Sequence, residues 1–267
     1  MPFTVSHIAA VLPWHKPLRR LGLISAAAIG AMAPDLDLIL PVRLTRDQTH
    51  GGLALLTFCL PVGLAAWALF QVLIKPALIE VLPDGIHARL SAEHLGPRLG
   101  SVKAWLYAAL AILSGALTHI VWDGFTHEDA GGLRILPGLG EELTELGPSA
   151  RPLYHWLQHG STVIGAAAVL VALWLWVMHA GRPNPPPERR LSLRERRRWM
   201  ALYILIPVLL VALAPINLIG WRRFHFMEAL TLLAVTGMRG AALSLTFTSA
   251  LIRRRLLIQG IEHSTVR

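Results

Sequence analysis

Six long apolar blocks constrain this 267-residue chain more than any other feature of its sequence. Hydrophobic residues make up 54% of the chain, and they come in long runs rather than in short amphipathic stripes. A helix needs about 20 mostly apolar residues to cross a bilayer. We therefore predict an all-α fold, a polytopic membrane helical bundle of about six transmembrane helices, at roughly 21–40, 51–74, 103–124, 160–179, 200–220 and 227–252.

The basic residues lie mainly between these blocks, above all in the segment 182–199 (RPNPPPERRLSLRERRRW). Cytoplasmic loops of membrane proteins carry an excess of Lys and Arg, so this segment, residues 75–103 and the C-terminal tail with its RRR at 253–255 are predicted to be cytoplasmic. The acidic loop 128–159 would then lie outside. The net charge of +9 is interpreted as matching anionic lipid, with no nucleic-acid partner.

The same reasoning predicts the domain organisation and the location. The protein is expected to be a multi-pass protein of the inner (plasma) membrane. Its predicted parts are a metal-site membrane domain, a basic cytoplasmic loop and a C-terminal helix pair with the tail, at 1–180, 181–199 and 200–267. The short basic loops that depart from the predicted orientation hold Arg43, Arg46, Arg222 and Arg223.

Ionisable side chains inside the apolar blocks are the second informative feature, because such groups are costly in a membrane and usually mark function. The segment LTHIVWDGFTH (117–127) places His119, Asp123 and His127 four residues apart. At 3.6 residues per turn, these three side chains can share one helix face. The other candidates, in chain order, are His7, Asp35 or Asp37, His50, His155 and His159.

Under the predicted topology, all these helix ends point to the outer side of the membrane. Only His7 needs a further condition, namely that the segment 3–14 enters the membrane as a short re-entrant helix. Imidazoles and carboxylates without thiolates suit a borderline divalent ion, so Zn²⁺ is expected. The candidate ligands exceed the needs of one ion, which predicts a cluster of two or three ions with a bridging carboxylate.

Each motif alone also has a simpler interpretation. A His-x3-Asp pair in a helix can be a buried hydrogen-bonded pair, and His155 with His159 can be interfacial residues. Asp35 and Asp37, which follow Pro34, can form a turn that caps a helix. The shared predicted side of the membrane favours a metal site over these alternatives.

The opening MPFTVSHIAAVLP, followed by GAMAPDLD, a THGG histidine and HIVWDGFTH, resembles a bacterial family of uncharacterised integral membrane proteins. That family is similar to the inner-membrane group described as membrane-bound metal-dependent hydrolases. The likeness covers roughly residues 1–180. It implies a membrane protein whose polar residues hold a metal.

The order of the candidate ligands is distantly similar to that of the zinc-dependent phospholipase C and P1-type nuclease superfamily. Those enzymes are all-helical and hold three zinc ions. The resemblance implies three groups of ligands in this chain: Asp35, His50, His119 and Asp123 for one ion; His127, His155 and His159 for a second; and His7 with a bridging Asp123 for a third.

The sequence departs from the superfamily pattern in several places. The later helix ends in His159 where the superfamily has a carboxylate. The spacing H-x3-D-x3-H at 119–127 is shorter than the H-x3-D-x5-H of the superfamily. The N-terminal tryptophan of those enzymes has no counterpart at Met1-Pro2, and those enzymes are soluble.

Together these observations predict a membrane-embedded metal-dependent hydrolase that acts on a phosphate ester of a lipid or lipid-linked substrate. Asp123 and Asp35 are the expected catalytic carboxylates, and Glu128 is a candidate general acid or supporting group. Arg134 and Arg151 are candidate phosphate-binding residues. The alternatives are a non-enzymatic metal-binding or transport protein, and a structural membrane protein whose histidines bond between helices.

Overall fold

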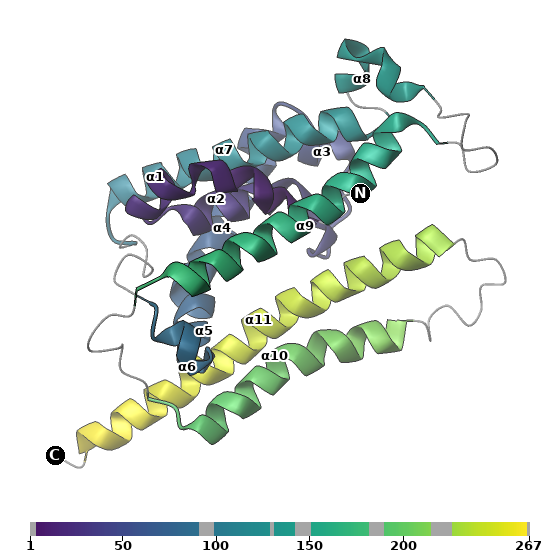
Figure 1. Cartoon of the computed structure of the whole chain (residues 1–267). Helices are drawn as coiled ribbons and strands as arrows, with labels where there is room; N and C mark the ends of the chain where they lie inside the picture. The colour runs from purple at the N-terminus through teal and green to yellow at the C-terminus, as the bar shows by residue number, and fades with distance from the viewer. Residues whose placement is uncertain are drawn as a thin grey trace. The chain divides into compact units, whose positions relative to one another are not determined.

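The computed structural model describes residues 4–90, 99–128, 131–141, 151–181, 190–214 and 226–265. The regular secondary structure of these segments is helical, and no strand is found among them, which confirms the predicted all-α class (Figure 1). The chain divides into two compact units, each of which is described by itself.

Unit 1 comprises residues 1–37, 42–67 and 92–180 and contains every predicted metal ligand. Its helical elements are η1 (Thr4–Trp14), α1 (His15–Arg20), α2 (Ile24–Met32), η2 (Ala33–Leu38), α3 (Arg46–His50), η3 (Leu55–Cys59), α4 (Leu60–Leu69), α7 (Val102–Thr126), α8 (Gly132–Ile135), η6 (Pro137–Gly140) and α9 (Leu153–His179).

Unit 2 comprises residues 38–41, 68–91 and 181–267. Its long helices α10 and α11 run side by side (Figure 1). The hydroxyl groups of Tyr203 on α10 and Ser249 on α11 share a hydrogen bond of 2.7 Å between them. Its helical elements are η4 (Phe70–Ile74), α5 (Lys75–Val81), α6 (Asp84–His87), α10 (Leu193–Leu213) and α11 (Phe226–Thr265).

Four helices in the described part of the chain are long and apolar enough to cross a membrane. The first is continuous through η3, α4, η4 and α5. These helices match four of the predicted spans, whereas the spans predicted at 21–40 and 200–220 are not confirmed. The four helices are Leu55–Val81, Val102–Thr126, Leu153–His179 and Ala229–Ile258.

The span predicted at 21–40 is interrupted near its centre. Helix α2 ends at Met32, and the 3-10 helix η2 follows directly. Pro34 accounts for the change, because a proline has no backbone N–H and cannot continue the i to i−4 hydrogen bonds of an α-helix. The break turns the chain so that Asp35 lies buried in η2 rather than at the end of a straight helix.

The span predicted at 200–220 begins earlier in the structure. Helix α10 starts after Ser192, whose hydroxyl accepts a hydrogen bond from the Glu195 backbone N–H. Its first two turns, LRERRR, are charged, which limits the apolar length available for crossing a membrane. Residues 215–220 of that predicted span lie outside the described residues, as do residues 182–189 of the predicted basic loop.

The short N-terminal helix predicted at 3–14 is present as the 3-10 helix η1, which packs against α9. The Ser6 hydroxyl donates a hydrogen bond of 2.9 Å to the Thr162 carbonyl oxygen. Gly165 of α9 approaches so closely that a Cβ atom there would lie 2.7 Å from the Ser6 carbonyl oxygen. η1 is therefore held within unit 1 beside α7 and α9.

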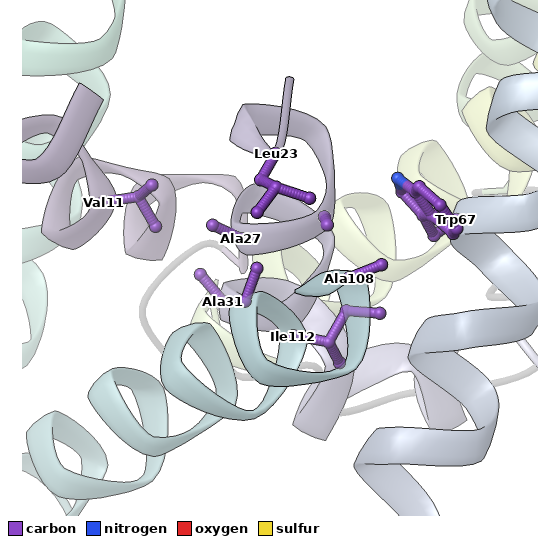
Figure 2. Close-up of a cluster of buried hydrophobic side chains, with 9 residues drawn as sticks. Val11, Leu23, Ala27, Ala31, Trp67, Ala108 and Ile112 are labelled. Carbon is purple, nitrogen blue, oxygen red and sulfur yellow. The ribbon is translucent and has the colours of Figure 1, made fainter. Parts of the chain in front are cut away.

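Helices α2 and α7 pack closely because glycines remove side-chain bulk from their contact. A Cβ atom on Gly30 would overlap the Ile112 carbonyl oxygen, and one on Gly115 would overlap the Ala27 carbonyl oxygen. Small residues let helices in a membrane approach backbone to backbone. The apolar cluster around this contact is drawn in Figure 2 and includes Val11, Leu23, Ala27, Ala31, Trp67, Ala108 and Ile112.

We expect Gly115→Ala to destabilise unit 1, because the new methyl group must push α2 away from α7. Forcing extra volume into a packed core typically costs about 1–3 kcal/mol. Gly124→Ala on the same helix is the control, since its Cβ would meet no atom closer than 3.8 Å. Thermal unfolding of the two detergent-purified variants measures the difference. Equal melting temperatures would contradict the role given to the α2–α7 contact.

Candidate metal centre

Five side chains from four helical elements meet in the interior of unit 1. His7 comes from η1, Asp35 from η2 and His50 from the last residue of α3. Helix α7 contributes His119 and Asp123, one turn apart, as the i, i+4 spacing predicts. His7, Asp35, His119 and Asp123 are buried, and the His50 side chain is 10% exposed.

Asp35, His50 and His119 form one group of potential metal ligands, and Asp123 contacts both of its histidines. His50 Nε2 lies 3.4 Å from Asp35 Oδ1 and 3.5 Å from Asp123 Oδ2. His119 Nε2 lies 3.8 Å and 3.7 Å from the same two oxygens. Zinc–ligand bonds of 2.0–2.2 Å in a tetrahedron place ligand atoms roughly 3.3–3.6 Å apart. The four imidazole–carboxylate distances are therefore close to those between neighbouring ligands of one ion.

His7 forms a second group of potential ligands with His119 and Asp123. Its Nε2 atom lies 3.6 Å from Asp123 Oδ1, the oxygen that does not face His50. The His7 and His119 rings stack with their centroids 3.7 Å apart. Asp123 thus presents one oxygen to each group, as a bridging carboxylate would.

Neighbouring groups fix the orientation of three of these side chains. His119 Nδ1 is 2.7 Å from the Ala31 carbonyl oxygen, which can only accept a hydrogen bond, so Nδ1 carries a proton and Nε2 is the nitrogen that bears the lone pair when the ring is neutral. His50 Nδ1 is 2.7 Å from the Thr49 hydroxyl. Thr4 donates a 2.7 Å hydrogen bond to Asp35 Oδ2, which leaves Oδ1 directed at the histidines. Such outer contacts typically orient metal ligands.

The polar atoms that face the centre of this cluster have no hydrogen-bond partner among the described residues. Buried polar groups without a partner are rare, because each costs the free energy of its desolvation. A bound ion or water molecule would supply the missing partner for several such atoms that face the same place. The unpartnered atoms are His7 Nε2, His50 Nε2, His119 Nε2 and Asp123 Oδ1.

The protonation states of His7 and Asp35, two of the candidate ligands outside the long apolar helices, suit metal binding. Burial, reinforced by the nearby His119, lowers the pKa of His7 to about 4. Burial alone would raise the pKa of Asp35, but its contacts with His50 and His119 outweigh burial and hold that pKa below its usual value. At neutral pH, His7 is therefore neutral and Asp35 ionised, the forms that bind a divalent ion.

Arg46 is the cationic side chain nearest the cluster in the described part of the chain. Its guanidinium donates a 3.0 Å hydrogen bond to Asp123 Oδ2, and its side chain is 40% exposed. Arg46 and His50 line a cavity of about 420 Å³ whose other lining residues include Thr45, Asp47 and Gly51. The sequence indicated Arg46 only as an exception to the predicted orientation.

His127 lies at the edge of the cluster rather than inside it. The Gln158 side-chain amide donates a 3.1 Å hydrogen bond to His127 Nε2. His127 Nδ1 lies 3.2 Å from the Asp123 carbonyl oxygen and 3.5 Å from Asp123 Oδ2. With both ring nitrogens engaged, His127 contacts Asp123 in the structure and belongs to neither group of potential ligands.

The remaining predicted site residues lie outside the two groups. His155 and His159 stack on each other on α9, with their ring centroids 6.3 Å apart. Glu128 is exposed just after α7. Asp37 is partly buried, and Asp35 is the aspartate that belongs to a group of potential ligands.

The supporting residues Thr4, Thr49 and Gln158 were not predicted. Each is an uncharged residue type that is common in any helix, and its role depends on which side chain lies opposite it. The TH dipeptide at 49–50 offers a weak signal, because a hydroxyl next to a histidine can orient the ring. Nothing in the sequence marked Thr4 or Gln158.

A family model described as "Domain of unknown function (DUF4184)" matches residues 1–250. The chain belongs to this family. The match agrees with the expected kinship to an uncharacterised family, and it includes every candidate ligand. No curated protein and no solved structure matches the chain.

We expect Thr49→Val, a change of nearly equal volume, to weaken metal binding, because His50 Nδ1 loses its partner. Loss of such an outer contact typically costs about 10–100-fold in affinity. The control is Thr57→Val, an exposed threonine whose hydroxyl bonds only the Leu53 carbonyl oxygen among the described contacts. Competition with a chromogenic zinc chelator measures both affinities. Equal affinities in the two variants would contradict the orienting role of Thr49.

Proposed function

We propose that this DUF4184 protein is a membrane-embedded, zinc-dependent hydrolase that cleaves the phosphate ester of a lipid or lipid-linked substrate. The observation that carries the proposal is the convergence of unpartnered buried atoms from His7, His50, His119 and Asp123. Together with Asp35, these residues form two groups of three potential ligands that share His119.

The chemistry of the donors supports zinc. Neutral imidazole nitrogens and carboxylate oxygens at tetrahedral spacing suit this ion, and the chain's single cysteine, Cys59, belongs to neither ligand group. His119 has one free nitrogen, so it can bind only one ion. We assign Asp35, His50, His119 and Asp123 Oδ2 to the first ion, and His7 with Asp123 Oδ1 to a second.

The polar cavity beside the cluster supports hydrolysis rather than storage of an ion. A bound divalent ion would activate a water molecule and neutralise charge on a phosphoryl group. The cavity of about 420 Å³ gives the substrate and water access to His50. Arg46 is positioned to bind a phosphate oxygen there, because a planar guanidinium binds phosphate through paired hydrogen bonds.

The apolar character of the surrounding helices supports a substrate drawn from the membrane. Helices α7 and α9 are both long and apolar enough to cross a bilayer, and α7 carries two of the ligands. The basic segments of the sequence favour a site on the outer face of the inner membrane, with the C-terminus in the cytoplasm.

We expect purified wild-type protein to contain zinc and to hydrolyse 4-nitrophenyl phosphate or bis(4-nitrophenyl) phosphate. Asp123→Ala should lose both properties, because its two oxygens face both ligand groups. His15→Ala is the control, since His15 is exposed and bonds only the Leu12 carbonyl oxygen among the described contacts. Elemental analysis and release of 4-nitrophenol measure the two effects.

The outcomes separate the proposal from its alternatives. A folded protein that binds no metal would overturn the metal centre. A protein that binds zinc and hydrolyses neither probe would favour the non-enzymatic metal-binding or transport alternative. Activity that disappears with a chelator and returns with zinc would support the hydrolase.

Arg46→Gln should raise KM for these probes by about 10–100-fold while the zinc content stays unchanged. The change removes a charge-assisted hydrogen bond of about 1.5–3 kcal/mol but none of the ligands. Arg43→Gln is the matched control, because Arg43 is exposed and does not line the polar cavity. Unchanged steady-state kinetics in Arg46→Gln would contradict the phosphate-binding role.

A further inference from the structure

A second cavity in unit 1, of about 530 Å³, lies between η1, α7 and α9 and is almost wholly apolar. We call it the apolar groove. Its volume falls within the range of small-molecule pockets, roughly 300–1,000 Å³. The groove is lined by Ser6, His7, Ala9, Ala10, Thr118, Val121, Trp122, Trp156, Leu157, Gly160, Ser161, Ile164 and Gly165.

The polar side chains of the groove, apart from His7, are satisfied by the protein itself. Ser6 donates to the Thr162 carbonyl oxygen, and Thr118 donates to the Gly115 carbonyl oxygen. Ser161 donates to the Gln158 carbonyl oxygen and accepts from Trp122 Nε1 at 3.1 Å. The hydroxyl groups of the groove are therefore occupied within the protein, and the largely apolar surface that remains suits a hydrocarbon chain.

His7 connects the groove to the candidate metal centre. It lines the groove, while its Nε2 atom lies 3.6 Å from Asp123 Oδ1. His50 lines the polar cavity and lies 3.5 Å from Asp123 Oδ2. An apolar space and a polar space are thus each lined by a histidine that contacts the same carboxylate.

The rim of the groove carries large exposed apolar side chains. Val121, Trp156 and Ile164 are between 46% and 71% exposed. These residues belong to α7 and α9, which are long and apolar enough to cross a membrane. Exposed apolar surface on such helices faces hydrocarbon, so a lipid chain can enter the groove sideways without crossing water.

We propose that the apolar groove holds the hydrocarbon chain of the substrate, with the phosphate ester at the metal centre and the polar remainder in the cavity of Arg46. This assignment rests on the proposed function and narrows its substrate to phosphate esters with a long alkyl or isoprenyl chain. In the reaction, the oxygen of water bonds to phosphorus, the bond to the leaving oxygen breaks, and that oxygen takes a proton from solvent.

The test compares 4-nitrophenyl methyl phosphate with 4-nitrophenyl dodecyl phosphate, using zinc-loaded full-length protein in detergent. Each buried methylene group strengthens binding by about fourfold, so the dodecyl probe should have the higher kcat/KM. Gly160→Phe should fill the groove, because a Cβ at Gly160 meets no atom within 4 Å. We expect this variant to lower kcat/KM for the dodecyl probe at least tenfold more than for the methyl probe.

Ala167→Phe adds the same side chain to α9 at an exposed position that does not line the groove, and it should leave both probes unaffected. A second readout, independent of hydrolysis, is tryptophan quenching by a brominated dodecyl phosphate, since Trp122 and Trp156 line the groove. Quenching in the wild type should weaken in Gly160→Phe and persist in Ala167→Phe.

The outcomes distinguish the two proposals. Hydrolysis of both probes without a preference for the dodecyl chain, or with equal losses in Gly160→Phe, would overturn the groove assignment and leave the hydrolase intact. Quenching that is sensitive to Gly160→Phe, without hydrolysis of either probe, would uphold the groove as a lipid site and overturn the hydrolase. Quenching that is insensitive to Gly160→Phe would also overturn the groove assignment.

Discussion

The burial of two carboxylates is the constraint on which the rest of unit 1 depends. Asp35 and Asp123 are each 3% exposed, and they lie among helices made largely of apolar residues. A buried charge costs several kcal/mol unless opposite charge and hydrogen bonds compensate for it. Thr4, Arg46 and four histidines contact the carboxylates, yet Asp123 Oδ1 and three imidazole nitrogens still lack hydrogen-bond partners among the described residues. The two ions proposed above would satisfy these atoms.

The close contact of α2 and α7 also supports the arrangement of side chains around Asp35 and Asp123, although it lies away from these two carboxylates. Gly30 and Gly115 bring the two backbones together, and the Ala31 carbonyl oxygen then reaches His119 Nδ1. The same approach places η2, and with it Asp35, opposite α7. The close packing at Gly30 and Gly115 is therefore also what orients the candidate ligand His119. The segment 21–40 is apolar enough to be predicted as a transmembrane span. In the structure it forms the short helices α2 and η2 instead, and α2 packs against α7.

Helical periodicity predicted the part of the site that lies on one helix. His119 and Asp123 share a face of α7 because their spacing is local, and the joint occurrence of His7, Asp35 and His50 followed from chain order. Asp35 could not be separated from Asp37 by periodicity, because η2 is a 3-10 helix introduced at Pro34. Arg46 could not be predicted, since its contact with Asp123 joins residues 77 positions apart. His155 and His159 are four residues apart on α9, a spacing that metal ligands often have. The direction in which their side of the helix points depends on how α9 packs, which the spacing does not predict.

The position of η1 in the chain has a consequence for biogenesis. η1 is made first, yet the residues that hold it, Thr162 and Gly165, lie on α9. At the usual speed of synthesis, about 5–20 residues per second, α9 follows η1 after on the order of ten seconds. During that interval His7 lacks the contacts with α9 that hold η1 in place. The proposed ligand group that includes His7 can therefore be completed only after the third of the long helices, whereas Asp35, His50, His119 and Asp123 all precede α9 in the chain.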